Sequence, residues 1–86
     1  MHTVELLEEA VRLAERAGYK IRQEWLGGSA AGACEIKGRK WIFLDLSLGP
    51  ADQLEVVLDA LRAEPGVVAL AMPHPLRERL RRRRSA

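Results

Sequence analysis

The feature that most constrains this chain is the apolar run Trp41-Ile42-Phe43-Leu44, which Leu46 extends two residues further on. It lies within residues 40–46, where aromatic and branched side chains predict a β-strand. Successive side chains of a strand point to opposite faces of its sheet, so this strand is apolar on both faces. A sheet that contains it needs a cover on each face, or it presents apolar surface to a partner.

Helical periodicity precedes and follows this strand. Residues 3–17 carry apolar side chains at helical spacing, and Gly18 suits the left-handed position that ends a helix. A second helix begins at Pro50, repeats apolar residues at i, i+3, i+4 and i+7, and ends before Glu64-Pro65-Gly66. Both helices are therefore predicted to be amphipathic, with one face against a sheet.

Three other segments are predicted to be strands. Residues 19–25 alternate between apolar and charged side chains, as in a half-buried strand. Residues 33–37 form a hairpin with 40–46, because Gly38 supplies a turn signal. Residues 67–72, VVALAM, lie between chain breakers and are rich in β-formers, so we predict a fourth, buried strand.

The predicted fold is α+β, with element order α-β-β-β-α-β. Two helices cover one face of a mostly antiparallel four-stranded sheet in a two-layer sandwich. If the third and fourth strands lie parallel in that sheet, the crossover between them is right-handed. A length of 86 residues suits a single domain. We assign residues 1–76 to that domain and 77–86 to an arginine-rich C-terminal tail, either disordered or a short helix.

The turn length of the hairpin decides which side chains share a face. A two-residue turn at Gly38-Arg39 pairs Ile36 with Trp41. That register gathers four apolar side chains on one face, namely Cys34, Ile36, Trp41 and Phe43. A three-residue turn moves Cys34 and Ile36 to the face opposite Trp41. In both registers Trp41 and Phe43 stay together, and they are the candidate protein-interface residues. Either the C-terminal segment or the long loop covers their face, or it binds a protein, most simply a second copy.

Residues suited to catalysis are sparse. Cys34 is the only cysteine, and the histidines, His2 and His74, lie near the N-terminus and between two prolines. A cysteine nucleophile needs a neighbouring base, and a zinc site needs closely spaced ligands, so we interpret Cys34 as a small core residue. The stretch GGSAAG at 27–32 matches no phosphate-binding loop, because a strand follows where a helix is required.

Four carboxylates near the second helix were the remaining candidates for acid–base or cation chemistry: Asp45, Asp52, Glu55 and Asp59. Such residues more commonly cap and solubilise a helix, which is our interpretation here. The sequence therefore predicts a protein that is not an enzyme and that has no cofactor or metal.

The basic charge is concentrated at one end. Residues 77–86 carry six arginines against Glu78, a net charge of +5, whereas the other 76 residues carry 8 basic and 11 acidic groups. The candidate contacts for a polyanion are Arg77, Arg79, Arg81, Arg82, Arg83 and Arg84. No aromatic residue lies between these arginines to stack on bases.

The α-β-β-β-α order resembles that of double-stranded-RNA-binding domains in length and in the sequence of elements. The second helix of that family begins with a glycine- and lysine-rich segment that grips phosphates. Here the corresponding segment is LGPADQLEVV, which is acidic, and Glu5, Glu8 and Glu9 place negative charge on the first helix. Because these groups repel phosphates, we do not carry RNA binding over to the folded face.

These observations predict a non-catalytic protein-interaction module that is homodimeric through a sheet face. The alternative is a nucleic-acid-associated accessory protein that acts through its arginine-rich tail. The single cysteine, the absence of a signal-peptide pattern and the short apolar runs favour the cytoplasm and no membrane insertion.

Overall fold

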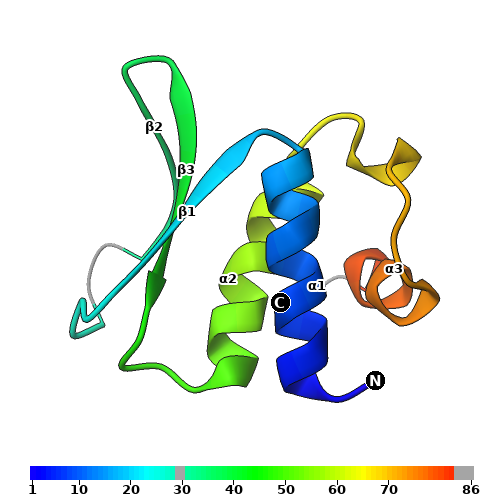
Figure 1. Cartoon of the computed structure of the whole chain (residues 1–86), viewed down its shortest axis with the longest axis horizontal. Coiled ribbons are helices and arrows are strands. Elements are labelled where there is room, and N and C mark those ends of the chain that lie inside the picture. Colours follow the sequence, from blue (N-terminus) through cyan, green and yellow to red (C-terminus); the bar gives the residue numbers. More distant parts are fainter. Residues whose placement is uncertain (29–30, 83–86) are drawn as a thin grey trace.

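The computed structural model describes residues 1–28 and 31–82. Three helices and a three-stranded sheet are present: α1 (Thr3–Arg16), α2 (Pro50–Arg62) and α3 (His74–Arg81). Figure 1 shows α1 and α2 side by side between the sheet and α3. The α+β class is thus confirmed, whereas the four strands and the two-layer arrangement are not.

The sheet contains β1 (Tyr19–Glu24), β2 (Gly32–Ile36) and β3 (Arg39–Asp45) in the spatial order β1-β3-β2. The central strand β3 runs parallel to β1 and antiparallel to β2, so the sheet is mixed rather than mostly antiparallel. The parallel pair arises because the chain passes from β1 to the far edge, forms β2, and returns through a hairpin into the middle.

The predicted fourth strand at residues 67–72 is wrong. Val67–Ala69 form a 3₁₀ helix, η1, and the chain then runs extended toward α3. Gly66, with φ of 84°, turns the chain just before η1, and the amide of Leu70 donates to the carbonyl of Val67. This segment lies on the α3 side of the helix pair, away from the sheet, so the three described strands are out of its reach (Figure 1).

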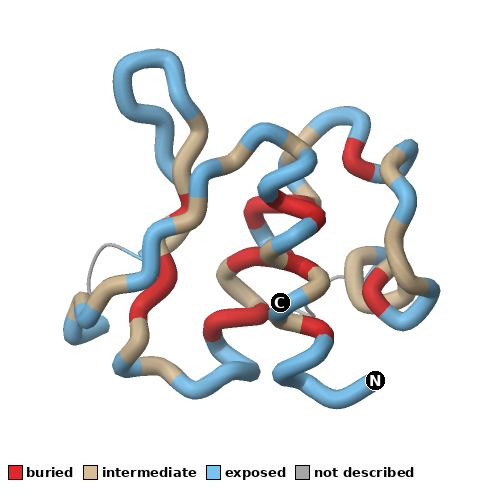
Figure 2. Tube along the Cα trace, viewed as in Figure 1, coloured by how far each residue is buried: buried red, intermediate tan, exposed pale blue. Residues whose placement is uncertain are grey.

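The hydrophobic core extends from the sheet through the α1–α2 pair to η1 and α3, as the buried positions in Figure 2 show. It contains Leu6, Ala10, Leu13 and Ala14 of α1, Leu54, Val57, Leu58, Ala60 and Leu61 of α2, Ile42 and Leu44 of β3, Val67, and Leu76 of α3. Leu76 is completely buried, so α3 belongs to the packed body of the protein. Within residues 1–28 and 31–82, no helix combines the length and apolarity needed to cross a bilayer.

Candidate functional site

The two faces of β3 differ in what covers them. Ile42 and Leu44 are completely buried under the helices, and the residues that alternate with them, Trp41 and Phe43, lie on the opposite face and are half-buried. The two rings stack, with centroids 6.0 Å apart and planes 16° from parallel. No helix of the described residues lies on this side of the sheet (Figure 1). We call it the open face.

The hairpin register differs from both predicted alternatives. The turn consists of Lys37 and Gly38, whose φ angles of 52° and 78° are both positive, as a type I′ turn requires. Ile36 therefore pairs with Arg39, and Cys34 pairs with Trp41. The predicted two-residue turn paired Ile36 with Trp41, so the observed partner of Ile36 lies two residues earlier on β3. An even shift preserves the faces, so the four side chains expected together in that register do share the open face.

Cys34 is exposed on this face, so our interpretation of it as a core residue is wrong. The described helices cover only the other face of the sheet. A β2 side chain on the open face is therefore not packed against a helix. His2 lies at the start of α1, and His74 begins α3 and pairs with Glu78 at 3.6 Å. Neither histidine lies on a strand that neighbours Cys34.

The open face is divided by charge. Apolar Cys34 and Ile36 lie on the β2 side, and Ile36 is 44% exposed. On the β1 side, Lys20 and Arg22 lie beside Trp41 and Phe43 in the parallel register, and the Lys20 ammonium sits 5.7 Å from the Trp41 ring centre. Sequence reasoning missed these two cations, because alternation places them on the outer face of β1 but does not reveal that β1 pairs with β3.

Asp45, at the end of β3, is completely buried. Its carboxylate accepts the N–H groups of Leu26 and Gly28 at 3.0 and 2.6 Å, and the N–H and hydroxyl of Ser47 at 2.9 and 2.6 Å. The Ser47 hydroxyl, with these backbone donors, holds the pKa of Asp45 well below its usual range, although burial opposes the shift. Since the β1–β2 loop crosses the end of β3 here, Asp45 fixes that crossing.

The other three carboxylates do not join Asp45. Asp52 is exposed in the first turn of α2, and Glu55 and Asp59 form ion pairs with arginines. In the described part of the chain, no three His, Cys, Asp or Glu side chains gather closely enough to hold a metal ion.

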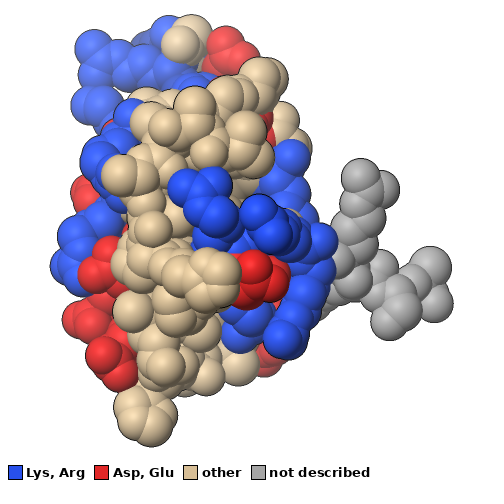
Figure 3. All heavy atoms as spheres, turned by 90° about the vertical axis from the view of Figure 1, so that its right-hand side faces the viewer, with Lys and Arg blue, Asp and Glu red and all other residues tan. Residues whose placement is uncertain are grey.

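The arginines of residues 77–86 do not act as one group. Arg79 donates to Glu55 of α2 at 2.8 Å, and Arg77 donates to the carbonyls of Val68 and Leu70. Arg81 and Arg82 are exposed at the end of α3, while Arg83 and Arg84 lie outside the described residues. Figure 3 views the molecule from the α3 side, where Lys and Arg side chains gather; we call it the basic side. The sequence alone does not distinguish the arginines bound within the fold from those that face solvent.

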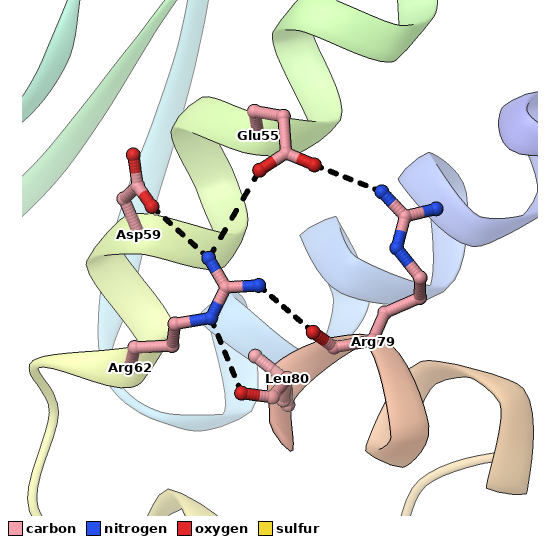
Figure 4. A network of polar contacts seen from close by, with 5 residues as sticks. All are labelled: Glu55, Asp59, Arg62, Arg79 and Leu80. Carbon is pink, nitrogen blue, oxygen red and sulfur yellow. Dashed lines mark hydrogen bonds and ion pairs between the residues drawn. The ribbon is translucent and has the colours of Figure 1, made fainter. Parts of the chain in front are cut away.

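Arg62 is the centre of the network in Figure 4 and was not recognised in the sequence. Its Nε and Nη2 donate to the carbonyls of Leu80 and Arg79, at 3.1 and 2.8 Å, in the last turn of α3. These carbonyls have no intrahelical partner at a helix end, so Arg62 caps α3 from outside. A third bond to Asp59 at 3.0 Å fixes the guanidinium on α2.

Comparisons with protein-family models, with curated proteins and with solved structures found no match.

Proposed function

We propose that this protein is a non-catalytic interaction module of the cytoplasm that forms a symmetric homodimer through the open face. The observation that carries the proposal is the stacked Trp41–Phe43 pair on a sheet face that no helix of the described residues covers. Aromatic side chains and arginine are enriched at the centres of protein interfaces. An exposed thiol such as Cys34 stays reduced in the cytoplasm.

A second copy fits this face because two of the three charged side chains along β1 meet opposite charges, while Arg22, which faces Arg22 of the second copy, is neutralised by its ion pair with Glu24 at 3.3 Å. A two-fold axis across the strands lays β1 over β1 of the second copy in reverse direction. Lys20 then faces Glu24 of the second copy, and the reciprocal pair forms at the same time. The Phe43 side chains meet near the axis, since Phe43 and Arg22 share one row of the sheet.

The small size of the open face favours a weak dimer. Three strands about 4.8 Å apart and about six residues long, at about 3.3 Å per residue, give a projected footprint of roughly 300 Å². Stable interfaces bury about 800 Å² per partner, so this one belongs at the weak end of the range. We expect dissociation in the micromolar range, and the assay has to cover that range.

Sedimentation equilibrium over low to high micromolar protein concentrations tests the dimer. The native chain is expected to shift from monomer to dimer mass, and a Trp41→Ala, Phe43→Ala double variant is expected to stay monomeric with unchanged helical circular dichroism. The matched control is Val4→Ala with Val68→Ala, which removes two exposed apolar side chains from helical segments away from the sheet. A native protein that is monomeric at high micromolar concentration contradicts the proposal, as does a control that dissociates equally.

The second candidate function is that of a nucleic-acid-associated accessory protein. Lys20 and Arg22 beside two aromatic rings favour it, because single-stranded nucleic acids bind through stacked bases and neutralised phosphates. Deleting residues 77–86 is a poor test, since it also removes Arg79 and Leu80 from the packed end of α3.

Paired substitutions separate the two basic regions instead. Lys20→Gln with Arg22→Gln neutralises the open face, and Arg81→Gln with Arg82→Gln neutralises the exposed end of α3. Binding to a fluorescent oligonucleotide is expected to weaken with salt and with one of these pairs. Binding that is insensitive to salt, or to both pairs, contradicts this candidate.

A further inference from the structure

A hollow of about 580 Å³ lies between the end of α2, η1 and α3, on the other side of the helix pair from the open face. Binding sites for small molecules typically measure about 300–1,000 Å³ and combine apolar walls with a few polar groups. This hollow has that composition. Val68, Met72 and Leu80 form its apolar wall, and Arg62, Arg77 and Arg81 supply its cations.

The apolar wall is open to solvent. Val68 is 75% exposed at η1, and Met72 and Leu80 are half-buried at the edge of the core. A medium-sized apolar chain laid against these three side chains would continue the hydrophobic core outward.

The charges of the hollow do not cancel. Its two carboxylates are already paired, Asp59 with Arg62 at 3.0 Å and Glu64 with Lys40 at 2.5 Å. Arg77 forms no ion pair with any carboxylate in the part of the chain that the structure describes. It uses two of its five N–H donors on backbone carbonyls and keeps the others. Among the described residues Arg81 pairs only with Glu78, at 3.5 Å, so the described lining of the hollow is positive overall.

We propose that this hollow binds an aliphatic carboxylate. A guanidinium group offers two parallel N–H donors that match the two oxygens of a carboxylate, and Arg77 and Arg81 stand where such a group would lie. The aliphatic chain covers Val68, Met72 and Leu80. The hollow is separate from the open face. A negative result for carboxylate binding therefore does not count against the proposed dimer, and a monomeric protein does not count against carboxylate binding.

Octanoate is the probe, titrated below its micelle concentration into the ¹⁵N-labelled full chain and followed by amide chemical shifts. We expect saturable shifts in η1, α3 and the end of α2, and no comparable shifts on β1 or β3. Octylammonium carries the same chain with the opposite charge, and inorganic phosphate carries negative charge without a chain. Neither is expected to saturate the site.

Arg81→Gln tests the cation without disturbing the core, because Arg81 is exposed and its ion pair among the described residues is with Glu78 on the same helix. It is expected to weaken octanoate binding about fivefold, the loss of roughly one charge-assisted hydrogen bond at a partly solvated site. Arg82→Gln is the matched control, since it removes the same charge one residue further on and does not line the hollow.

Val68→Gln tests the apolar wall and is also expected to weaken octanoate binding, whereas Val4→Gln on α1 is expected to have no effect. Equal binding of octylammonium shows that only the chain is recognised, and equal binding of phosphate shows that only charge is recognised. Either result overturns the proposal. So do equal losses in the Arg81 and Arg82 variants, or shifts that map to the sheet.

Discussion

Leu76→Ala tests whether α3, which carries Arg77, Arg79 and Arg81, is an integral part of the fold. Leu76 is completely buried in the core, and the substitution removes three carbon atoms from it. At about 0.8 kcal/mol per buried methylene the transfer loss is about 2.4 kcal/mol, and the cavity adds to it, so we expect about 3 kcal/mol. An 86-residue domain has a free energy of unfolding of about 4–13 kcal/mol, so this is a large fraction.

Urea unfolding followed by circular dichroism measures the change, and a thermal midpoint lowered by roughly 12–24 °C is expected with it. Val68→Ala is the control, because this exposed side chain contributes less than about 0.5 kcal/mol when it is truncated. A cost for Leu76→Ala below about 1 kcal/mol would refute the reasoning, because the side chain would then not be packed as described. Amide exchange in α3 as slow as in α1 is the independent check.

Three further predictions concern single groups. Asp45→Asn lowers the urea midpoint at neutral pH far more than Asp52→Asn does. The pKa of Asp45 is lower in the folded state than in the unfolded state, so its carboxylate stabilises the fold above the unfolded pKa. This stability is lost as Asp45 is protonated, so the difference between the variants fades as the pH falls below 4. The only tyrosine, Tyr19, should ionise above its usual pKa of 10, since burial and a hydrogen bond to Glu64 favour the neutral form. Ultraviolet titration measures this pKa. The free energy that neutral Tyr19 contributes to folding is present below pH 10 and is lost as the pH rises through the raised pKa of the folded state. Lys37→Asn should raise the thermal midpoint by a few degrees, equivalent to about 0.5–1 kcal/mol, because asparagine tolerates positive φ better than lysine. A lower midpoint would contradict the type I′ turn.

Local patterns predicted the elements that depend on neighbouring residues. The periodicity of 3–17 and the proline–breaker boundaries of the second helix agree with α1 and α2 to within a few residues. The three strands were also found, since alternation and a glycine turn are properties of short segments. The partners of those strands were not predictable from such patterns. The parallel pairing of β1 with β3 is set by a chain crossing that leaves no periodic signal.

The segment at 67–72 shows where propensity fails. Val67, Val68 and Leu70 are strand formers, but a strand needs a neighbour with free backbone groups. Here α1 and α2 stand between this segment and the sheet, so the turn that begins at Gly66 closes its own hydrogen bonds instead. The position of this segment in the fold, rather than its composition, determines that it forms a 3₁₀ helix.

The candidate sites show a similar division. Trp41 and Phe43 were singled out because a strand apolar on both faces has a surplus of apolar surface, and both do lie opposite the helices. Six arginines in one run predicted a uniform basic tail. Two of them, Arg77 and Arg79, are used as hydrogen-bond donors within the fold, which only the positions of their acceptors reveal.

The central position of β3 also dictates an order of assembly. The β2–β3 hairpin is closed by a two-residue turn and can form locally, whereas β1 and β2 never touch each other within the sheet. We therefore expect the hairpin to form first and the sheet to be completed when it docks against β1, a less local step that costs more loop entropy and is slower. On this route Asp45 receives the amides of Leu26 and Gly28 only in that last step. We expect its burial to report the completion of the sheet.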